Sequence, residues 1–271
     1  LYHYHRNTAG AANSFFNNLS GAARPKLLIN VFGASAGGPV HQNRTFLFLN
    51  YEGRRDASAR NVTRTVPSNE LRQGIVQYLR RDGTVGRLTP QDIQTRLDPL
   101  GIGVSQKVLE TLRLYPAPND TSIGDGMNVA GYRFISPVRS KQDTYIARLD
   151  HILDRPGKHT LFWRGNLQND HAGDVPQFPG DPPSSVRLDN SKGFALGYNA
   201  LLRPNLISTL RYGLTRQGVE STGVQSRAMV IFRQFDSRYA QTRGLSDILP
   251  VQNLSQDITW NRGAHTVQLG G

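Results

Sequence analysis

The sequence predicts an all-β fold: a partial transmembrane antiparallel β-barrel, with about nine strands of a larger barrel and long loops that carry short helices. Apolar and polar residues alternate with a period of two in five or six segments of about ten residues. Short turns and long polar connections follow one another in strict alternation. Apolar runs stay below the roughly 18 residues that a spanning helix needs, which excludes a helical membrane protein.

The predicted strands each pair an apolar face with a more polar one. They occupy 44–55, 144–153, 160–168, 194–202 and 206–215, followed by a pair around 258–260 and 266–269. The apolar faces are formed by Leu47, Leu49, Tyr51, Tyr145, Ala147, Leu149, Leu161, Trp163, Leu167, Phe194, Leu196, Tyr198, Leu210, Tyr212, Leu214, Ile258, Trp260, Val267 and Leu269. A soluble β-sandwich also alternates, but its strands average only about 5–6 residues. The strand length therefore favours membrane-spanning strands, which need about 9–11 residues.

Turn-forming residues separate these strands at 41–43, 154–157, 203–205 and 261–263. Long connections are predicted at 56–131, 170–186 and 218–254. This asymmetry is typical of bacterial outer-membrane barrels, whose periplasmic turns are tight and whose extracellular loops are extended. The whole chain, 1–271, is thus interpreted as one incomplete barrel domain in a bacterial outer membrane.

Two short helices are predicted within the longest loop. Thr89 and Asp92 form a capping box around Pro90, which favours a helix leading to Leu97. A second helix is expected from Gln106 to Leu114, because Ser105 precedes it and Val108, Leu109 and Leu112 share one face. Pro116 and Pro118 end it.

Composition excludes several functions. The chain has 271 residues, of which 37% are hydrophobic, and it contains no cysteine, so thiol catalysis, cysteine zinc sites and disulfides are ruled out. Its net charge of +12 is the one feature that suggests a nucleic-acid partner. The basic residues are scattered, however, and anionic lipopolysaccharide or an anionic solute would suit them equally well. We expect no nucleic-acid partner.

Charged residues on the polar faces are the candidate lumen-facing residues. They are Arg148, Asp150, Arg164 and Arg211. A charge facing lipid near the midplane costs about 2–4 kcal/mol, so these side chains should point into the barrel. A structural lattice of ion pairs is the preferred interpretation, and direct ligand binding is the alternative.

Two other motifs have plainer interpretations. The segment 33–37 matches G-x-S-x-G, but Gly38 and Pro39 follow it instead of the helix that a hydrolase nucleophile requires. His3 and His5 share one face of a strand without an evident third ligand, while Tyr2 and Tyr4 on the other face suit an interfacial aromatic girdle. We expect no enzyme activity, no metal and no cofactor.

Several blocks, taken in order, resemble the barrel of TonB-dependent outer-membrane receptors of the Oar-like group, which carry a carboxypeptidase-regulatory-like domain. The blocks are 32–40 with 44–48 and 51–53, 66–68 with 72–74, 114–119, 148–151 with 159–162, 211–216 and 263–266. The resemblance spans nearly the whole chain. It implies a plug and an N-terminal domain before residue 1, absent from this sequence, and further strands after residue 271, in a barrel of about 22 strands.

The resemblance implies import of a large solute, such as a siderophore complex, glycan or peptide, with energy passed by the TonB complex to the plug. Outer-membrane lipid, lipopolysaccharide and the unknown solute are the other expected partners. An outer-membrane adhesion or sorting protein, without active transport, is the alternative.

Overall fold

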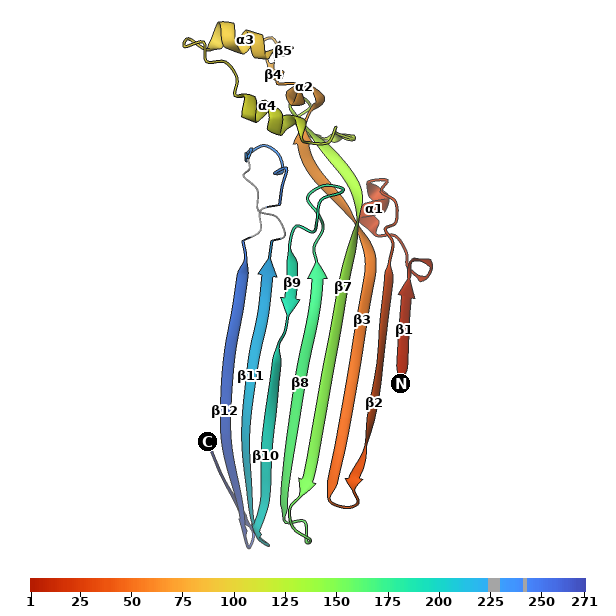
Figure 1. Ribbon diagram of the computed structural model, residues 1–271, viewed down its shortest axis with the longest axis vertical. Coiled ribbons are helices and arrows are strands. Elements are labelled where there is room, and N and C mark those ends of the chain that lie inside the picture. The colour runs from red at the N-terminus through yellow and green to blue at the C-terminus, as the bar shows by residue number, and fades with distance from the viewer. Residues whose placement is uncertain (224–229, 241–242) are drawn as a thin grey trace.

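The computed structural model describes residues 1–223, 230–240 and 243–271. Within these residues, eleven strands form one antiparallel sheet, of which nine follow one another across it (Figure 1). These nine are β1 (Tyr2–Asn7), β2 (Leu28–His41), β3 (Thr45–Pro67), β7 (Val129–Ile152), β8 (His159–Gly173), β10 (Lys192–Arg203), β11 (Leu206–Thr222), β12 (Leu245–Arg262) and β13 (His265–Gly270). The prediction of an antiparallel sheet with about nine sequential strands is confirmed.

The predicted turns join the strands at one end of the sheet, called here the turn end. Pro204 and Asn205 connect β10 to β11, and Gly263 with Ala264 connects β12 to β13. Asn43 has a φ of 58° and Gly157 a φ of 73°, left-handed values that tight reversals require. The long connections lie at the opposite end, the loop end.

Strands are longer than predicted, so the long connections are shorter. β3 has 23 residues and β7 has 24, paired without interruption from Thr45 opposite His151 to Pro67 opposite Val129. The connections therefore run over 68–128, 174–185 and 223–244, not 56–131, 170–186 and 218–254. Part of the third, 224–229 and 241–242, lies outside the described residues. The alternation of apolar and polar residues ends where lipid no longer covers one face of the sheet. Backbone pairing between the strands continues beyond that point, so the strands are longer than the alternation predicts.

A short strand, β9 (Val186–Asp189), continues the line of β10 towards the loop end. It pairs with β8 on one side and β11 on the other, as β10 does. The break between them is bridged by Ser191, whose hydroxyl donates to Asp189 at 2.6 Å and accepts from the Gly218 amide at 3.2 Å.

The connections carry short helices, as predicted. Thr89 and Asp92 form the expected capping box at the start of α3 (Pro90–Asp92), which continues as a π-helical turn, η2 (Ile93–Leu97). The second predicted helix is α4 (Gln106–Arg113). The remaining small elements are η1 (Thr8–Gly10), α1 (Phe15–Leu19), α2 (Asn69–Arg72), β4 (Val76–Leu79), β5 (Val85–Leu88) and β6 (Asp120–Gly124). No helix in the described part of the chain is long and apolar enough to cross a membrane.

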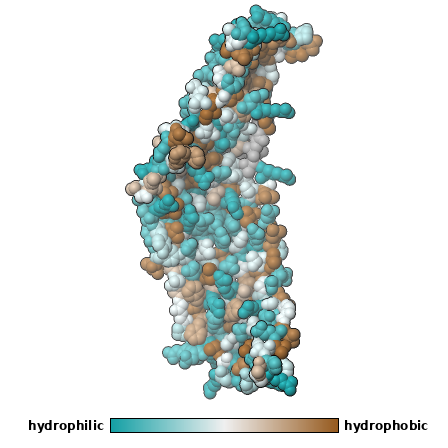
Figure 2. Space-filling model, turned by 180° about the vertical axis from the view of Figure 1, so that it is seen from behind, coloured by the Kyte–Doolittle hydropathy of each residue, from teal (hydrophilic) through white to brown (hydrophobic). Residues whose placement is uncertain are grey.

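The sheet has two chemically distinct faces. Cross-strand partners share a face, so the register aligns Leu49 with Ala147 and Gly165, and Leu149 with Trp163 and Leu196. We call this the apolar face. The opposite, polar face includes Asn50, Glu52, Arg148, Asp150, Arg164, Asn199 and Arg211. Hydrophilic residues are spread over the strands and over the loop end in the view of Figure 2.

The expected aromatic girdle at Tyr2 and Tyr4 is wrong. Tyr2 pairs with Gly33, which pairs with Glu52, so both tyrosines lie on the polar face. His3 and His5 lie on the apolar face instead. Tyrosines alternate with histidines in β1, so its own sequence does not show which of its two faces is the apolar one. Only its pairing with β2 decides which residues lie on the apolar face and which on the polar face.

The hydrophobic core lies among the loops and not within the strand region. Its residues, called here the loop core, are Val66, Leu112, Tyr115, Val129, Phe178 and Phe235. They come from the loop-end tips of β3 and β7 and from all three long connections. Strands lined by lipid on one face and water on the other need no such core, because neither face packs against a second layer.

Candidate functional site

Arg148 and Asp150 form a bidentate ion pair on the polar face of β7. Nε and Nη2 of Arg148 each donate a hydrogen bond of 2.8 Å to a different carboxylate oxygen of Asp150. The two side chains are 45% and 40% exposed, so water screens the pair, and it stabilises the fold by about 0–1 kcal/mol at most. The pair is available to a solute or to another protein segment passing this face.

Arg164 and Arg211 lie exposed on the same face, and neither forms an ion pair with any residue that the structure describes. Arg164 stands directly opposite Arg148 on the neighbouring strand, and Arg211 stands opposite Gly197. Like charges opposite each other destabilise a sheet unless an anion lies between them. The four predicted residues therefore share one face, but they form one ion pair and two uncompensated cations within the described chain, not a lattice.

An aromatic ring that was assigned no role in the sequence lies beneath this cluster. The Arg148 guanidinium carbon lies 4.9 Å from the ring centroid of Phe162, a cation–π distance. A Cβ built on Gly197 would lie 2.0 Å from Cε1 of Phe162, so the ring covers this glycine. Phe48 is the partner of Arg148 on the other side. The Phe162 ring thus packs against the arginine on a face that alternation alone would assign to polar residues.

Tyr2 and Glu52 make a second contact on the polar face that sequence reasoning missed. The Tyr2 hydroxyl donates a hydrogen bond to Oε2 of Glu52 across the intervening strand β2. Gly33 lies between them, and a Cβ there would lie 2.5 Å from the tyrosine oxygen. The glycine in the G-x-S-x-G segment therefore admits a tyrosine, and Ser35 lies within a continuous strand instead of at a strand-to-helix turn.

Polar contacts tie two of the long connections to the tip of β3. Asp236 accepts hydrogen bonds from the Thr65 amide at 2.7 Å and from its hydroxyl at 3.0 Å. Arg64 donates to the carbonyls of Pro176 and Gln177 at 3.3 and 3.2 Å. Together with the loop core, these contacts make the loop end a packed layer rather than a set of independent loops.

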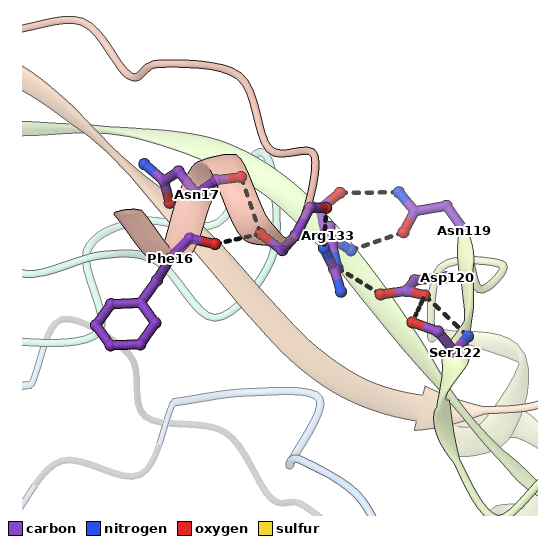
Figure 3. A network of polar contacts seen from close by, with 7 residues as sticks. Phe16, Asn17, Asn119, Asp120, Ser122 and Arg133 are labelled. Atoms are coloured by element: carbon purple, nitrogen blue, oxygen red, sulfur yellow. Dashed lines mark hydrogen bonds and ion pairs between the residues drawn. The ribbon is translucent and has the colours of Figure 1, made fainter. Parts of the chain in front are cut away.

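A second polar network fixes the 8–27 segment to β6 and β7 (Figure 3). Arg133 pairs with Asp120 and donates to the Ser20 carbonyl at 3.3 Å, while the Ser20 hydroxyl donates to the Phe16 carbonyl at 2.9 Å. Hydrogen bonds from Ser122, together with the Arg133 guanidinium, hold the pKa of the Asp120 carboxyl below its ordinary value. The charge of Asp120 thus supports an anchor between segments far apart in sequence.

The loop layer contains a half-open cavity of about 560 Å³. Its wall is largely apolar and includes Val108, Leu109, Leu112, Phe232 and Phe235. Asp125 also borders it, but its carboxylate accepts hydrogen bonds from the amides of residues 127, 128 and 129. Shape and apolar contact are what this cavity offers to a ligand. Among the described residues, no group of three His, Cys, Asp or Glu side chains is placed to hold a metal ion.

Comparison with known protein families identifies the fold family of the chain. A family model described as an outer membrane beta barrel domain matches residues 1–271. Neither the search of curated proteins nor the search of solved structures finds a significant match.

Proposed function

Since the chain belongs to the outer membrane beta barrel domain family and is thereby located in a bacterial outer membrane, we propose that it forms part of the wall of a TonB-dependent importer for a large solute. Outer-membrane barrels place their short turns at the periplasm and their long loops outside the cell. The turn end is therefore assigned to the periplasm, the loop end to the outside of the cell, and the polar face to the lumen.

The observation that carries the proposal is the polar face, on which Arg148, Asp150, Arg164 and Arg211 lie within the four neighbouring strands β7, β8, β10 and β11. These charges are compatible with a wet lumen and not with lipid. The nine sequential strands of the described sheet leave β1 and β13 at its edges. Open edges are not tolerated in lipid, and the resemblance to TonB-dependent receptors implies a barrel of about 22 strands.

The ordered sequence blocks support TonB-dependent import of the Oar-like kind. The block 32–40 lies in β2 and leads to a turn-end reversal, and the block 114–119 links α4 to β6 at the loop end. The uncompensated charges of Arg164 and Arg211 favour a negatively charged solute or plug segment. A siderophore complex, a glycan or a peptide is the expected class of cargo, and the TonB complex is the expected source of energy.

Uptake in cells tests this function. The complete protein is expressed with and without a functional TonB complex, and uptake of labelled siderophores, glycans and peptides is followed. We expect one class to enter only when TonB works, and we expect Arg164→Gln with Arg211→Gln to slow its entry at least severalfold. A TonB-independent uptake of the same cargo would contradict the proposal.

Adhesion or sorting at the cell surface is the second candidate. The packed loop layer favours it, because a rigid outer surface suits recognition of a partner. Substitution of Phe178 by Ala, inside the loop core, should then abolish attachment while leaving any uptake unchanged. Loss of uptake without loss of attachment would instead favour transport.

A further inference from the structure

We propose that the apolar face carries a binding site for the phosphate of lipopolysaccharide, formed by Lys192 and Arg216 where the apolar face meets the loop end. This site is independent of the proposed transport, because it lies on the lipid side of the sheet and not on the lumenal side.

Lys192 and Arg216 are direct cross-strand partners at the loop-end margin of the apolar face. The next same-face pair towards the turn end is Phe194 with Leu214, and the partner of Lys192 on its other side is Leu167. Two cations thus stand side by side, immediately above apolar residues that face hydrocarbon. Like charges in this position repel each other, and a phosphate between them would remove the repulsion.

Neither cation forms an ion pair with any residue that the structure describes. A nearby basic pair on the same face is different. Arg55 lies 2.6 Å and Lys141 lies 3.4 Å from the carboxylate of Asp143, which is 4% exposed. The protein therefore supplies its own counter-charge to one basic pair of this margin and leaves the other for an external anion.

An apolar depression of about 880 Å³ begins at these two residues and extends across the apolar face. Its floor includes small residues that lie in one row across the sheet, namely Ala36, Ala147 and Gly165. Leu49 lies in the same row, paired with Ala36 on one side and with Ala147 on the other, and Ala147 pairs with Gly165. Larger side chains border it, among them Tyr51, Tyr145, Trp163 and Phe194. The depression can take acyl chains while the cations hold the headgroup.

Charge and position together select the occupant. The loop end faces outward, and the outer leaflet there consists of lipopolysaccharide, which joins several acyl chains to phosphate groups. A basic cluster next to the membrane surface attracts anionic headgroups, with a contribution that grows with each Lys or Arg. A free phosphate would use the cations but not the depression, and a neutral lipid would use the depression but not the cations.

Native mass spectrometry of the complete protein in detergent tests the site, with lipopolysaccharide-derived lipid A, dephosphorylated lipid A and phosphatidylglycerol as probes. For Lys192→Gln with Arg216→Gln we expect about tenfold weaker lipid A binding. Lys192→Arg with Arg216→Lys should keep most of it, because both charges remain. Dephosphorylated lipid A should bind the unaltered protein about as weakly as lipid A binds the glutamine variant.

The matched control removes two charges from the other face. Arg164→Gln with Arg211→Gln should leave lipid A binding unchanged, and heat-modifiable migration on a gel shows that each variant folds. Lipid A binding that survives in the Lys192 and Arg216 variant would overturn the proposal. So would an equal loss in the control variant, equal binding of dephosphorylated lipid A, or a preference for phosphatidylglycerol.

Discussion

Arg238 and Asp181 join two long connections at the loop end: Nη1 of the arginine lies 2.7 Å from Oδ2 of the aspartate, and the side chains are 18% and 14% exposed. Arg238 also donates from Nε to the Leu114 carbonyl at 2.9 Å, so one guanidinium contacts all three connections. Its ring contacts with Phe178 and Tyr239, at 5.3 and 4.8 Å from the centroids, place it over the loop core.

Replacing Arg238 by Ala should loosen the loop layer and leave the strands intact. We expect a local loss of about 1.5–3 kcal/mol, the range for hydrogen bonds to charged groups. Hydrogen exchange should show faster exchange at 174–185 and around Leu114, with unchanged protection in β7 and β8. Arg187→Ala, in β9, is the control; equal exchange in both variants would contradict a joining role for Arg238.

Tyr115 should make the loop layer sensitive to high pH. It is 1% exposed, and burial raises the pKa of its hydroxyl to about 12. In the unfolded chain a tyrosine ionises near its ordinary pKa of 10. The contribution of the neutral Tyr115 hydroxyl to stability is therefore fully present below pH 10 and is lost as the pH rises towards about 12. In phenolate absorbance, the Tyr115→Phe variant should lack one late-titrating tyrosine that the unaltered protein shows. Titration of that tyrosine near pH 10 would contradict its burial.

Gly197 and Gly213 offer a matched pair of substitutions on the polar face. A Cβ at Gly197 would overlap the Phe162 ring, whereas the nearest atom to a Cβ at Gly213 is 3.8 Å away. Gly197→Ala should therefore displace Phe162 from beneath Arg148 and destabilise the barrel by about 1–3 kcal/mol. Gly213→Ala should be close to neutral. Urea titration of the complete protein in lipid vesicles measures both, and equal effects would contradict the packing described.

Leu149 and Ile146 test which face meets lipid. Leu149 is on the apolar face and Ile146 is on the polar face of the same strand. An arginine facing the hydrocarbon near the midplane costs about 2–4 kcal/mol, whereas the lumen tolerates one. Leu149→Arg should accordingly be the more destabilising variant in vesicle refolding. A larger loss for Ile146→Arg would reverse the assignment of the two faces.

Asp120 should make the anchor of the 8–27 segment sensitive to acid. The Ser122 hydrogen bonds and Arg133 lower the pKa of the Asp120 carboxyl. The contribution of its charge to the stability of the anchor is therefore fully present above the ordinary pKa of 3.8, and it is lost as the pH falls through the lowered pKa. Hydrogen exchange, corrected for the intrinsic pH effect, should show 8–27 losing protection in that range. Asp120→Asn should lack this transition, and a transition that persists in the variant would assign it to another group.

Much of the strand region could be predicted, because the physics is local. Turns such as 203–205 were located from Pro and Asn, and the apolar face from alternation around Leu149 and Leu196. The common face of Arg148, Arg164 and Arg211 followed from the same alternation. The ends of β3 and β7 could not be predicted, since beyond the lipid both faces meet water and the alternating signal disappears while backbone pairing continues.

Cross-strand relationships were the other limit. The position of Tyr2 depends on the register between β1 and β2, and Phe162 becomes a support for Arg148 only when Gly197 lies beside it. The pairing of Lys192 with Arg216 likewise depends on β10 and β11 being in register. The loop core joins Val66 to Phe235, and no local pattern specifies such a distant contact.

The placement of the loop core also bears on the order of folding. Its members are separated widely in sequence, and closing such long stretches of chain is entropically unfavourable until other contacts have brought the ends together. The hairpins joined by short turns can pair first, because their contacts are local. The outer layer would then be the final part to assemble, and a protease that meets the protein during insertion would cut there before it cuts the strands.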